Sequence, residues 1–324
     1  MQDLIMNITN TTLTTIRKCC PSCKCISFTS LCKVNYSDVG INKYLCTHYA
    51  GKASNIDLNE LNFELVQCKK CNLTYQTHVP NEKLLTEIYD VWIPKSTNEE
   101  RLIGHDLNYY RYLTEQVQFA IQSFDLSPHK IKVLDFGFGW AEFAKIAMAF
   151  GCEVSGSELS KERIEYAQSI GLKCVNIENL PNKYFHYINT EQVFEHLVDP
   201  VDILAKLVNA LRDDGILKIS VPNADNSIKL IKKNKTFSSL SLNEIMPIAP
   251  LEHINCFNYK SLVLLADKVG LKPICPSFKK IYNSSSGWFD MKNAIRLLIR
   301  PIYRHILPKS TFVYFSLKNE NSTP

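Results

Sequence analysis

The stretch that decides the fold is Val133-Leu134-Asp135-Phe136-Gly137-Phe138-Gly139-Trp140-Ala141-Glu142-Phe143. Its apolar run up to Asp135 predicts a buried strand, and the residues that follow predict a tight loop and the first turn of a helix. Gly137 and Gly139 let the backbone approach a ligand where a Cβ would clash, and a helix start offers unpaired N–H groups. The stretch therefore predicts a site for a nucleoside-like cofactor.

A strand, turn and helix of this kind also bind dinucleotides. The residue at the position of the third glycine of the dinucleotide pattern therefore helps to distinguish the two kinds of cofactor. The dinucleotide pattern needs a third glycine where this chain has Glu142, and a carboxylate in the first helical turn would repel a diphosphate. A carboxylate is tolerable beside a positively charged sulfonium, so a nicotinamide oxidoreductase is disfavoured. The pattern Asp-x-Gly-x-Gly-x-Ala resembles the first motif of the class I S-adenosylmethionine-dependent methyltransferases. This resemblance implies that S-adenosylmethionine is held by Asp135, Gly137, Gly139 and Ala141.

Strand and helix patterns alternate from residue 130 onward. We expect strands near 131–136, 152–157, 172–176, 186–191 and 215–221, helices near 140–150, 160–169 and 200–212, then a helix near 259–269 and strands near 272–281 and 311–318. Alternating units of this kind predict an α/β fold with a doubly wound, mostly parallel sheet that binds ligands at the carboxyl ends of its strands. The family resemblance implies the seven-stranded, Rossmann-like methyltransferase sheet.

Later polar positions fit the adenosine part of such a cofactor. Glu158 ends the second strand, nineteen residues beyond Gly139, where a carboxylate can accept both ribose hydroxyl protons. The alternative for Glu158 is a carboxylate that stabilises the start of the next helix. Glu178 or Asn179, after the third strand, is a candidate for the adenine edge because methyltransferases of this class commonly have an acid there; a surface loop is the alternative. Glu191, at the end of the fourth strand, completes the predicted cofactor set.

The fourth strand leads into a segment with candidate acid–base groups. The segment Glu191–Pro200 and the later segment Asp214–Asn223 resemble the EH-x-x-DP and GG-x-L-x-I-x-x-PN segments of one large group of these methyltransferases. His196 suits a general base, since its unperturbed pKa of about 6.5 lies near neutrality. Glu195 is placed to orient His196 or to hold a cation. The alternative is that both side chains only cap and lock the loop.

A second polar cluster follows the stretch Lys233–Met246, which we expect to form a loop or lid. The cluster contains Glu252-His253-Ile254-Asn255-Cys256-Phe257, which resembles the EHIN-x-F segment found beside the substrate opening in the same group. His253 is therefore a second candidate base or substrate ligand, and a structural histidine is the alternative.

Eight of the twelve cysteines fall within the first 71 residues. Four of these cysteines form two C-x₂-C pairs: Cys20 with Cys23, and Cys68 with Cys71. Two such pairs can close a tetrahedral Cys₄ site for a structural Zn²⁺, with strands near Cys25–Leu31 and Phe63–Gln67 between them. A reduced thiol cluster without metal is the alternative. The module resembles the zinc-binding head that precedes some bacterial methyltransferases, including sugar C-methyltransferases.

Composition and charge narrow the class of protein further. Hydrophobic residues make up 45% and charged residues 21%, as in ordinary globular proteins. No apolar run approaches the roughly 18 residues of a membrane span, and the N-terminus shows no secretory signal, so we expect a cytoplasmic protein. The net charge is +5, but residues 229–309 alone carry +10. This basic region is expected to meet an acidic or nucleotide-linked saccharide or to form a solvated surface, and no pattern indicates nucleic-acid binding.

We divide the chain into three predicted parts. They are a cysteine-rich zinc-binding module at 1–79, a helical connector or lid at 80–129 with a long helix from about Glu99 to Phe124, and a methyltransferase domain at 130–324. Within the last part, the basic and apolar segment Trp288–His305 is expected to pack on the sheet, with membrane-surface contact as the alternative.

The resemblance also bears on the acceptor. Sugar C-methyltransferases with such a zinc-binding head typically carry a further C-terminal domain, whereas this sequence stops after the last predicted strand. We therefore expect methylation of a hydroxyl on a sugar or surface-glycan precursor. The alternatives are C-methylation of a nucleotide-linked keto sugar and a cofactor-binding protein without catalysis.

Overall fold

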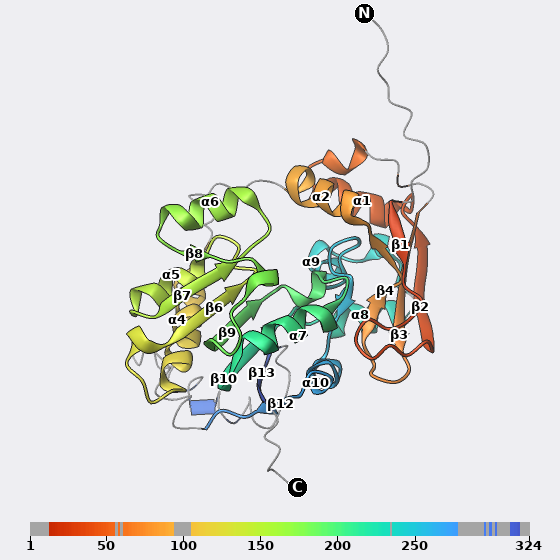
Figure 1. Cartoon of the computed structure of the whole chain (residues 1–324). Coiled ribbons are helices and arrows are strands. Elements are labelled where there is room, and N and C mark those ends of the chain that lie inside the picture. Colours follow the sequence, from red (N-terminus) through yellow and green to blue (C-terminus); the bar gives the residue numbers. More distant parts are fainter. Residues whose placement is uncertain are drawn as a thin grey trace, which may run out of the picture.

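The computed structural model describes residues 13–55, 58, 61–93, 105–233, 235–277 and 312–317, together with the single residues 295, 298, 299 and 302. Two β-sheets organise these residues. The larger sheet and its helices are drawn in yellow and green with a blue C-terminal part in Figure 1, and a smaller sheet, drawn mainly in red and orange, lies beside it.

Seven strands form the larger sheet, in the spatial order β12-β13-β10-β9-β6-β7-β8. Their bounds are β6 Lys132–Phe136, β7 Glu153–Ser157, β8 Lys173–Cys174, β9 Phe185–Glu191, β10 Leu211–Ser220, β12 Leu271–Ile274 and β13 Phe312–Leu317. Neighbours pair in parallel from β8 to β10, while β13 is antiparallel to both β10 and β12. The predicted α/β class and the mostly parallel seven-stranded sheet are confirmed.

Helices cover both faces of this sheet. They are α4 Leu107–Gln122, α5 Glu142–Ala149, α6 Lys161–Ser169, α7 Pro200–Ala210 and α10 Tyr259–Asp267. Apolar side chains of α4, α5 and α6 pack in one core cluster, and those of α7 and α10 pack in the cluster on the opposite face. The sheet is therefore doubly wound, as the alternating sequence pattern predicts.

The helix α4 begins later than its apolar stripe suggests. A start near Glu99 was expected, but the Asp106 carboxylate accepts the Tyr109 backbone N–H at 3.0 Å and caps a helix that begins at Leu107. Residues 94–104 lie outside the described residues. The buried side chains of α4 include Leu113, which packs in the same cluster as α5.

The smaller sheet contains a strand from the other half of the chain. Its strands are β2 Phe28–Asn35, β3 Asn62–Cys68, β4 Thr74–Gln76 and β11 Asn255–Cys256, all antiparallel. A separate ribbon pairs β1 Thr14–Ile16 with β5 His78–Pro80, and the helices beside these strands are α1 Val39–His48, α2 Glu82–Glu87 and the single π turn η2 Ile88–Trp92. The strands expected between the cysteine pairs are β2 and β3, whereas α1 has no counterpart in the sequence predictions. Because β11 completes this sheet, the predicted module at 1–79 is joined to the C-terminal half by backbone hydrogen bonds.

One apolar core also joins the two halves. Tyr36 and Phe63 from the N-terminal part pack in one cluster with Phe237 from the C-terminal half. Gly40 lies so close to the same segment that a Cβ there would be 2.2 Å from the backbone nitrogen of Ser238. The stretch expected to be a loop or lid therefore consists, in its described part, of packed short helices. These are the turn η6 Phe237–Ser239, the helix α9 Leu242–Ile245 and the start of the turn η7 Met246–Ile248, and they follow the helix α8 Asp225–Lys232.

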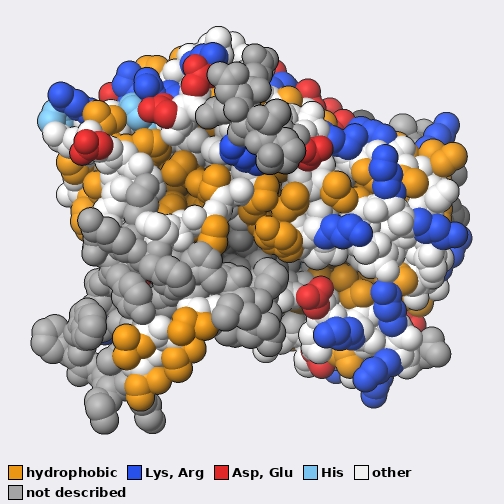
Figure 2. All heavy atoms as spheres, turned by 90° about the horizontal axis from the view of Figure 1, so that it is seen from below, with side chains coloured by type: hydrophobic (Ala, Val, Ile, Leu, Met, Phe, Trp, Pro, Cys, Tyr) orange, Lys and Arg blue, Asp and Glu red, His pale blue; other side chains and the backbone are white. Residues whose placement is uncertain are grey.

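The basic C-terminal region is described only in part. Most of Trp288–His305 lies outside the described residues, and its four described side chains, at 295, 298, 299 and 302, are about half exposed. On the face shown in Figure 2, Lys and Arg side chains are scattered over the described surface instead of forming one basic patch. Within the described ranges, no helix has the length and apolar character needed to cross a membrane.

Candidate active site and cysteine cluster

The glycine loop connects β6 to α5 through three residues with left-handed backbone conformations. The φ angle is 72° at Gly137, 56° at Gly139 and 59° at Ala141. A Cβ at Gly137 would lie 2.4 Å from the Val193 side chain, whereas one at Gly139 would meet no described atom within 4 Å. Gly137 therefore permits contact with the loop after β9, and Gly139 leaves the backbone open toward a ligand.

Glu158, at the end of β7, faces this loop. Its Oε2 accepts the backbone N–H of Gly139 at 2.9 Å, and its Oε1 accepts those of Leu159 at 2.8 Å and Ser160 at 3.2 Å. The last two bonds give Glu158 the helix-start role that the sequence left open, while the first places its carboxylate at the glycine loop. Ribose binding by this carboxylate stays a prediction.

A buried polar network behind the loop was not predicted. The Asn189 amide donates to Asp135 Oδ1 at 2.9 Å, and the Lys218 ammonium donates to Asn189 Oδ1 at 3.3 Å and to the Glu191 carboxylate. Glu191 also accepts from the Tyr112 hydroxyl at 3.0 Å. The predicted cofactor residues Asp135 and Glu191 are thus the two acidic members of one network.

Burial and charge act in opposite directions within this network. Burial raises the pKa of Asp135 to about 7, although the hydrogen bond from Asn189 and the charge of Lys218 favour its ionised form. Burial disfavours the charge on Lys218, but the Glu191 carboxylate and the nearby Tyr112 and Tyr314 together outweigh it, so the pKa of Lys218 lies above its usual value. A lysine in the otherwise apolar run Ile216–Ile219 is the sequence signal that could have revealed the network.

Glu178 and Asn179, the two candidates for contact with the adenine edge, lie in the short turn η4 (Ile177–Asn179). The Glu178 carboxylate pairs with the Lys206 ammonium of α7 at 2.7 Å, and the Asn179 side chain is exposed. The turn therefore has the surface position considered as the alternative, and its contact with adenine stays a prediction.

The three catalytic candidates come together beyond the carboxyl end of β9. Glu195 and His196 lie in the 3₁₀ turn η5 (Phe194–His196), and His253 precedes β11. His196 Nε2 is 3.8 Å from Glu195 Oε1, and the ring centroids of His196 and His253 are 4.9 Å apart. One potential ligand atom from each of the three residues lies within 4.8 Å of the other two. The fold thus unites groups that the sequence places in separate motifs.

Burial sets the charge state of these groups. The side chain of Glu195 is 1% exposed and that of His196 is 23% exposed. Burial raises the pKa of Glu195 well above its usual range, lowers that of His253 to about 4, and lowers that of His196. Both imidazoles are therefore neutral near pH 7 and offer a lone pair to a proton or a cation.

The N-terminal part supports this cluster through Glu252. The Tyr49 hydroxyl donates to the Glu252 carboxylate at 2.7 Å, and the His196 Nδ1 lies 3.0 Å from the Glu252 carbonyl oxygen. The Gln76 amide of β4 donates to the backbone carbonyl of His253 at 3.1 Å. Both histidines are thus held by a chain of contacts that begins in the cysteine-containing half.

Arg17, next to β1, holds both loops at once. Its guanidinium donates to the carbonyls of Leu197 at 3.2 Å and Val198 at 3.0 Å, and to the Ile254 carbonyl at 3.1 Å and Asn255 Oδ1 at 2.8 Å. These partners lie 180 to 238 positions away along the chain. No local pattern marks Arg17, so the sequence alone does not indicate its role.

Aromatic residues from the connector cover both sides of the site. The Tyr89 ring of η2 contacts His196 edge-on at 6.2 Å between centroids. Burial raises the pKa of Tyr89, and the charges of Glu195 and Glu158 raise it further. On α4, the Tyr109 hydroxyl donates to the Glu142 carboxylate at 3.4 Å. Tyr89 thus lies close enough to Glu195, a catalytic candidate, and to Glu158, a cofactor-binding candidate, for their charges to act on its hydroxyl.

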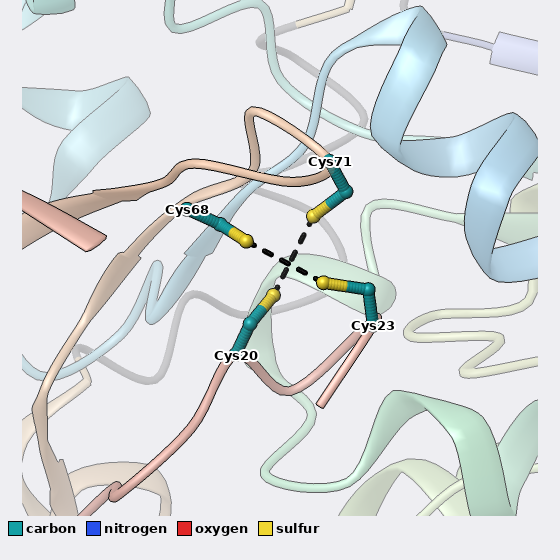
Figure 3. A group of neighbouring side chains, drawn as sticks. All are labelled: Cys20, Cys23, Cys68 and Cys71. Carbon is teal, nitrogen blue, oxygen red and sulfur yellow. Dashed lines mark hydrogen bonds between the residues drawn. The ribbon is translucent and has the colours of Figure 1, made fainter. Parts of the chain in front are cut away.

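The four predicted metal ligands converge in one cluster, shown in Figure 3. The sulfur atoms of Cys20 and Cys71 are 3.5 Å apart, those of Cys23 and Cys68 are 3.4 Å apart, and all four lie within 4.8 Å of one another. All four are free thiols. These separations suit four thiolates around one Zn²⁺ with Zn–S distances of about 2.3 Å.

The two C-x₂-C turns have matching geometry. Lys24 and Asn72, which each follow the second cysteine of a pair, have φ angles of 58° and 59°. The Lys24 N–H donates to the Cys20 carbonyl at 2.9 Å, and the Asn72 N–H donates to the Cys68 carbonyl at 3.0 Å. Each turn therefore directs its two thiols toward the same point.

The fold and the site together define a class of protein. A doubly wound sheet with an antiparallel seventh strand, a glycine loop after β6 and an acid at the end of β7 form the arrangement expected for a class I methyltransferase. Residues 105–275, more than half of the chain, match a family model described as a methyltransferase domain. The chain belongs to this family and is an S-adenosylmethionine-dependent methyltransferase.

Several solved structures are similar to the chain at low identity. Plantazolicin methyltransferase BpumL in complex with SAH is 16% identical with a TM-score of 0.43, over 73% of this chain and 94% of that one. A SAM-dependent methyltransferase from Archaeoglobus fulgidus is 14% identical with a TM-score of 0.38, over 74% and 100%. The 1,6-didemethyltoxoflavin-N1-methyltransferase of Burkholderia thailandensis is 13% identical with a TM-score of 0.43, over 78% and 99%. None of the curated proteins matches in sequence, and these likenesses say nothing about the substrate.

Proposed function

We propose that the chain transfers the methyl group of S-adenosylmethionine to a small-molecule acceptor bound beside Glu195, His196 and His253. The observation that carries this proposal is the contact between two loops. Gly137 of the cofactor loop lies against Val193, which precedes Glu195 by two residues. A cofactor on the first loop and an acceptor beside the second would be neighbours at the carboxyl edge of the sheet.

The cofactor residues in this proposal are the predicted set: Asp135, Gly137, Gly139, Ala141, Glu158, Glu178 or Asn179, and Glu191. The bound cofactor supplies a methyl group on a positively charged sulfur. Glu158 has the strongest support, because its carboxylate lies at the open Gly139 and can exchange a backbone partner for ribose hydroxyls. The buried network around Glu191 and Lys218 would keep the base of the site rigid.

His196 accepts the proton of the acceptor in this proposal. The Glu252 carbonyl can only accept a hydrogen bond, so the Nδ1 of His196 carries the ring proton and its Nε2 keeps a lone pair. The lowered pKa of His196 keeps the ring neutral near pH 7. As the acceptor oxygen forms its bond to the methyl carbon, the carbon–sulfur bond breaks in line and the hydroxyl proton moves to Nε2.

Among small molecules, we propose a hydroxyl of a sugar or surface-glycan precursor as the acceptor. Two observations support this choice. The cysteine module resembles the heads of sugar-modifying methyltransferases, and the excess of Lys and Arg in residues 229–309 suits an acidic or nucleotide-linked saccharide. C-methylation of a nucleotide-linked keto sugar would use the same acid–base groups, and the product distinguishes the two reactions.

We also propose that the cysteine cluster binds a structural Zn²⁺. The support is the set of four buried sulfur atoms within 4.8 Å of one another and the matched turns that carry them. Four thiolates close the tetrahedral shell of zinc and leave no position for water, so this ion would stabilise the fold without taking part in catalysis.

An acceptor screen on the full chain tests the proposed reaction. Nucleotide sugars, oligosaccharides, quinone precursors and RNA are each incubated with S-adenosylmethionine, and the release of S-adenosylhomocysteine is measured. We expect turnover with a saccharide and an O-methyl product by NMR. Cofactor binding without turnover on any acceptor would favour the non-catalytic alternative, and calorimetry that showed binding of NAD but not of S-adenosylmethionine would refute the proposal.

A further inference from the structure

At the centre of the cluster of Glu195, His196 and His253, three acceptor groups face one another, and no donor of the described residues lies between them. Neither oxygen of the Glu195 carboxylate has a hydrogen-bond partner among the described residues, and neither does His253 Nδ1. His196 Nδ1 is engaged with the Glu252 carbonyl, so its Nε2 lone pair lies on the side of Glu195, 3.8 Å from Oε1. Two imidazole lone pairs and a carboxylate therefore converge on one point.

Such a convergence is unfavourable unless something positive lies between the groups. Glu195 is 1% exposed, and a buried ionised carboxylate without partners costs several kcal/mol. Among the described residues the surroundings offer little compensation: the backbone N–H of Glu195 itself favours the charged carboxylate, and the nearby charge of Glu191 opposes it. Either a proton on the carboxyl or a bound cation resolves the conflict. A proton on Glu195 gives one donor, which can reach only one of the two imidazole lone pairs, whereas a cation satisfies all three groups.

We propose that Glu195, His196 and His253 bind a divalent first-row transition ion, through a carboxylate oxygen, Nε2 and Nδ1 respectively. Two imidazoles and one carboxylate favour Zn²⁺, Fe²⁺, Co²⁺ or Mn²⁺ over Mg²⁺ and Ca²⁺, which prefer oxygen ligands. Three protein ligands leave further coordination positions open, as in catalytic sites and unlike the closed cysteine cluster.

The groups behind the ligands fit this assignment. Metal-binding histidines usually direct their second nitrogen at a carbonyl or carboxylate, which fixes the ring and its tautomer. His196 does so through the Glu252 carbonyl at 3.0 Å, and the His253 ring is hydrogen-bonded to the backbone of Met246. The Glu252 carboxylate is in turn 2.8 Å from His48 Nε2, so the support extends into α1.

The ion would change how the acceptor is activated. Its catalytic role rests on the proposed methyl transfer, although its binding does not. An acceptor hydroxyl coordinated by the ion has a lowered pKa and can release its proton to solvent before the oxygen bonds to the methyl carbon. His196 is then a ligand instead of the base, one proton is released for each methyl group transferred, and the carbon–sulfur bond breaks as in the uncoordinated reaction.

Cobalt binding to the full chain tests the site. The protein is dialysed against a mild chelator that leaves the thiolate cluster loaded, and Co²⁺ is then added while the visible spectrum is recorded. We expect one Co²⁺ per chain with ligand-field bands and without the thiolate-to-cobalt charge-transfer band that the cysteine cluster would give. Glu195→Gln and His253→Gln should each weaken this binding by at least about tenfold. His129→Ala, which removes an exposed histidine, should bind as the wild type does.

A urea unfolding curve accompanies each measurement and shows that the variant is folded, and calorimetry separately measures its binding of S-adenosylhomocysteine. A folded wild type that takes up no Co²⁺ outside the cysteine cluster would overturn the proposal, and so would undiminished binding by both variants. If one variant fails to fold, the other decides. Uptake of Co²⁺ by a protein that does not bind S-adenosylhomocysteine would support the metal site and count against the proposed function, so the two failures are distinguishable.

Discussion

The cysteine cluster and the cluster of Glu195, His196 and His253 are built in opposite ways. Each cysteine pair belongs to one tight turn whose own backbone directs both thiols, as the matching left-handed conformations of Lys24 and Asn72 indicate. In the second cluster Glu195 and His196 share the turn η5, but His253 lies on a different loop, so no single turn fixes all three residues relative to one another. Their positions depend on contacts from outside those loops.

Those outside contacts come from the half of the chain that contains the cysteines. Arg17 holds the loops after η5 and before β11, and Gln76 and Tyr49 hold the backbone and side chain of the segment Glu252–His253. The positions of Glu195, His196 and His253 therefore depend on the cysteine-containing half, whereas the cysteine turns do not depend on these three residues. Damage to the cysteine cluster should disturb the cluster of Glu195, His196 and His253, called here the acid–base cluster. Damage to the acid–base cluster should leave the cysteines intact.

The largest effect should come from Cys71→Ser. Removing one thiolate opens the Cys₄ site, so we expect loss of zinc and destabilisation by more than about 4 kcal/mol. Turnover should also be lost, since β3 and β4 carry the contacts to β11. Zinc content, urea unfolding and S-adenosylhomocysteine release measure these effects, and Cys46→Ser, at an exposed thiol outside the cluster, is the control. A zinc-free variant with full turnover would contradict the dependence of the acid–base cluster on the cysteine cluster.

The next largest effect should come from Glu158→Ala, which tests whether the cofactor side is independent of both clusters. The variant loses charge-assisted hydrogen bonds to the ribose, so affinity for S-adenosylmethionine should fall about 100-fold. Zinc content should not change. Calorimetry and elemental analysis measure the two quantities, with Glu162→Ala on the exposed face of α6 as the control. Unchanged affinity would show that the end of β7 does not contact the cofactor.

A third prediction concerns Asp135, another buried carboxylate, which lies in the polar network behind the glycine loop. Burial raises the pKa of Asp135 from 3.8 to about 7, so its contribution to stability is greatest at low pH and is lost as the pH rises toward 7. Asp135→Asn should therefore gain about 2 kcal/mol relative to the wild type between pH 5 and pH 8. Urea unfolding at both pH values measures this gain, and the exposed Asp125→Asn is the control. A pH-independent difference would mean that Asp135 is ionised throughout.

The smallest effect should come from Arg17→Lys, which tests the link between the clusters directly. A lysine retains the charge but cannot reach both loops with a planar fork, so the acid–base cluster loosens. We expect turnover to fall about tenfold, or roughly 1.4 kcal/mol in activation free energy, with zinc content and cofactor affinity preserved. The exposed Lys18→Ala is the control. Loss of zinc in Arg17→Lys would place Arg17 in the cysteine module instead of at the link.

The sequence was most informative where structure is local. The apolar periods from residue 130 predicted the alternation of strands and helices along the chain, and the glycine spacing predicted the loop between Gly137 and Ala141. The two cysteine pairs predicted their own cluster because each pair is set by a single turn. These features depend on residues that are close together in the sequence, so the sequence alone is enough to predict them.

The sequence was least informative where distant segments meet. Glu195, His196 and His253 were each candidates, but only the fold brings their ligand atoms within 4.8 Å. Lys218 was overlooked because its partners lie on β9 and α4, and Arg17 because its partners lie beyond residue 196. The sequence also did not indicate that Asp106 caps the N-terminus of α4. Because of this cap the helix begins at Leu107 instead of near Glu99.

The strand β11 has a consequence for the order in which the chain folds. It pairs Asn255 with Tyr75, so the small sheet keeps an open edge at β4 until residues 255–256 have been synthesised. Part of the apolar core under that sheet, including Phe237 and Ile248, also arrives late. The segment with β2, β3 and β4 therefore completes its sheet only after residues 255–256 have been added, and a fragment ending at residue 79 should aggregate instead of folding as an independent module.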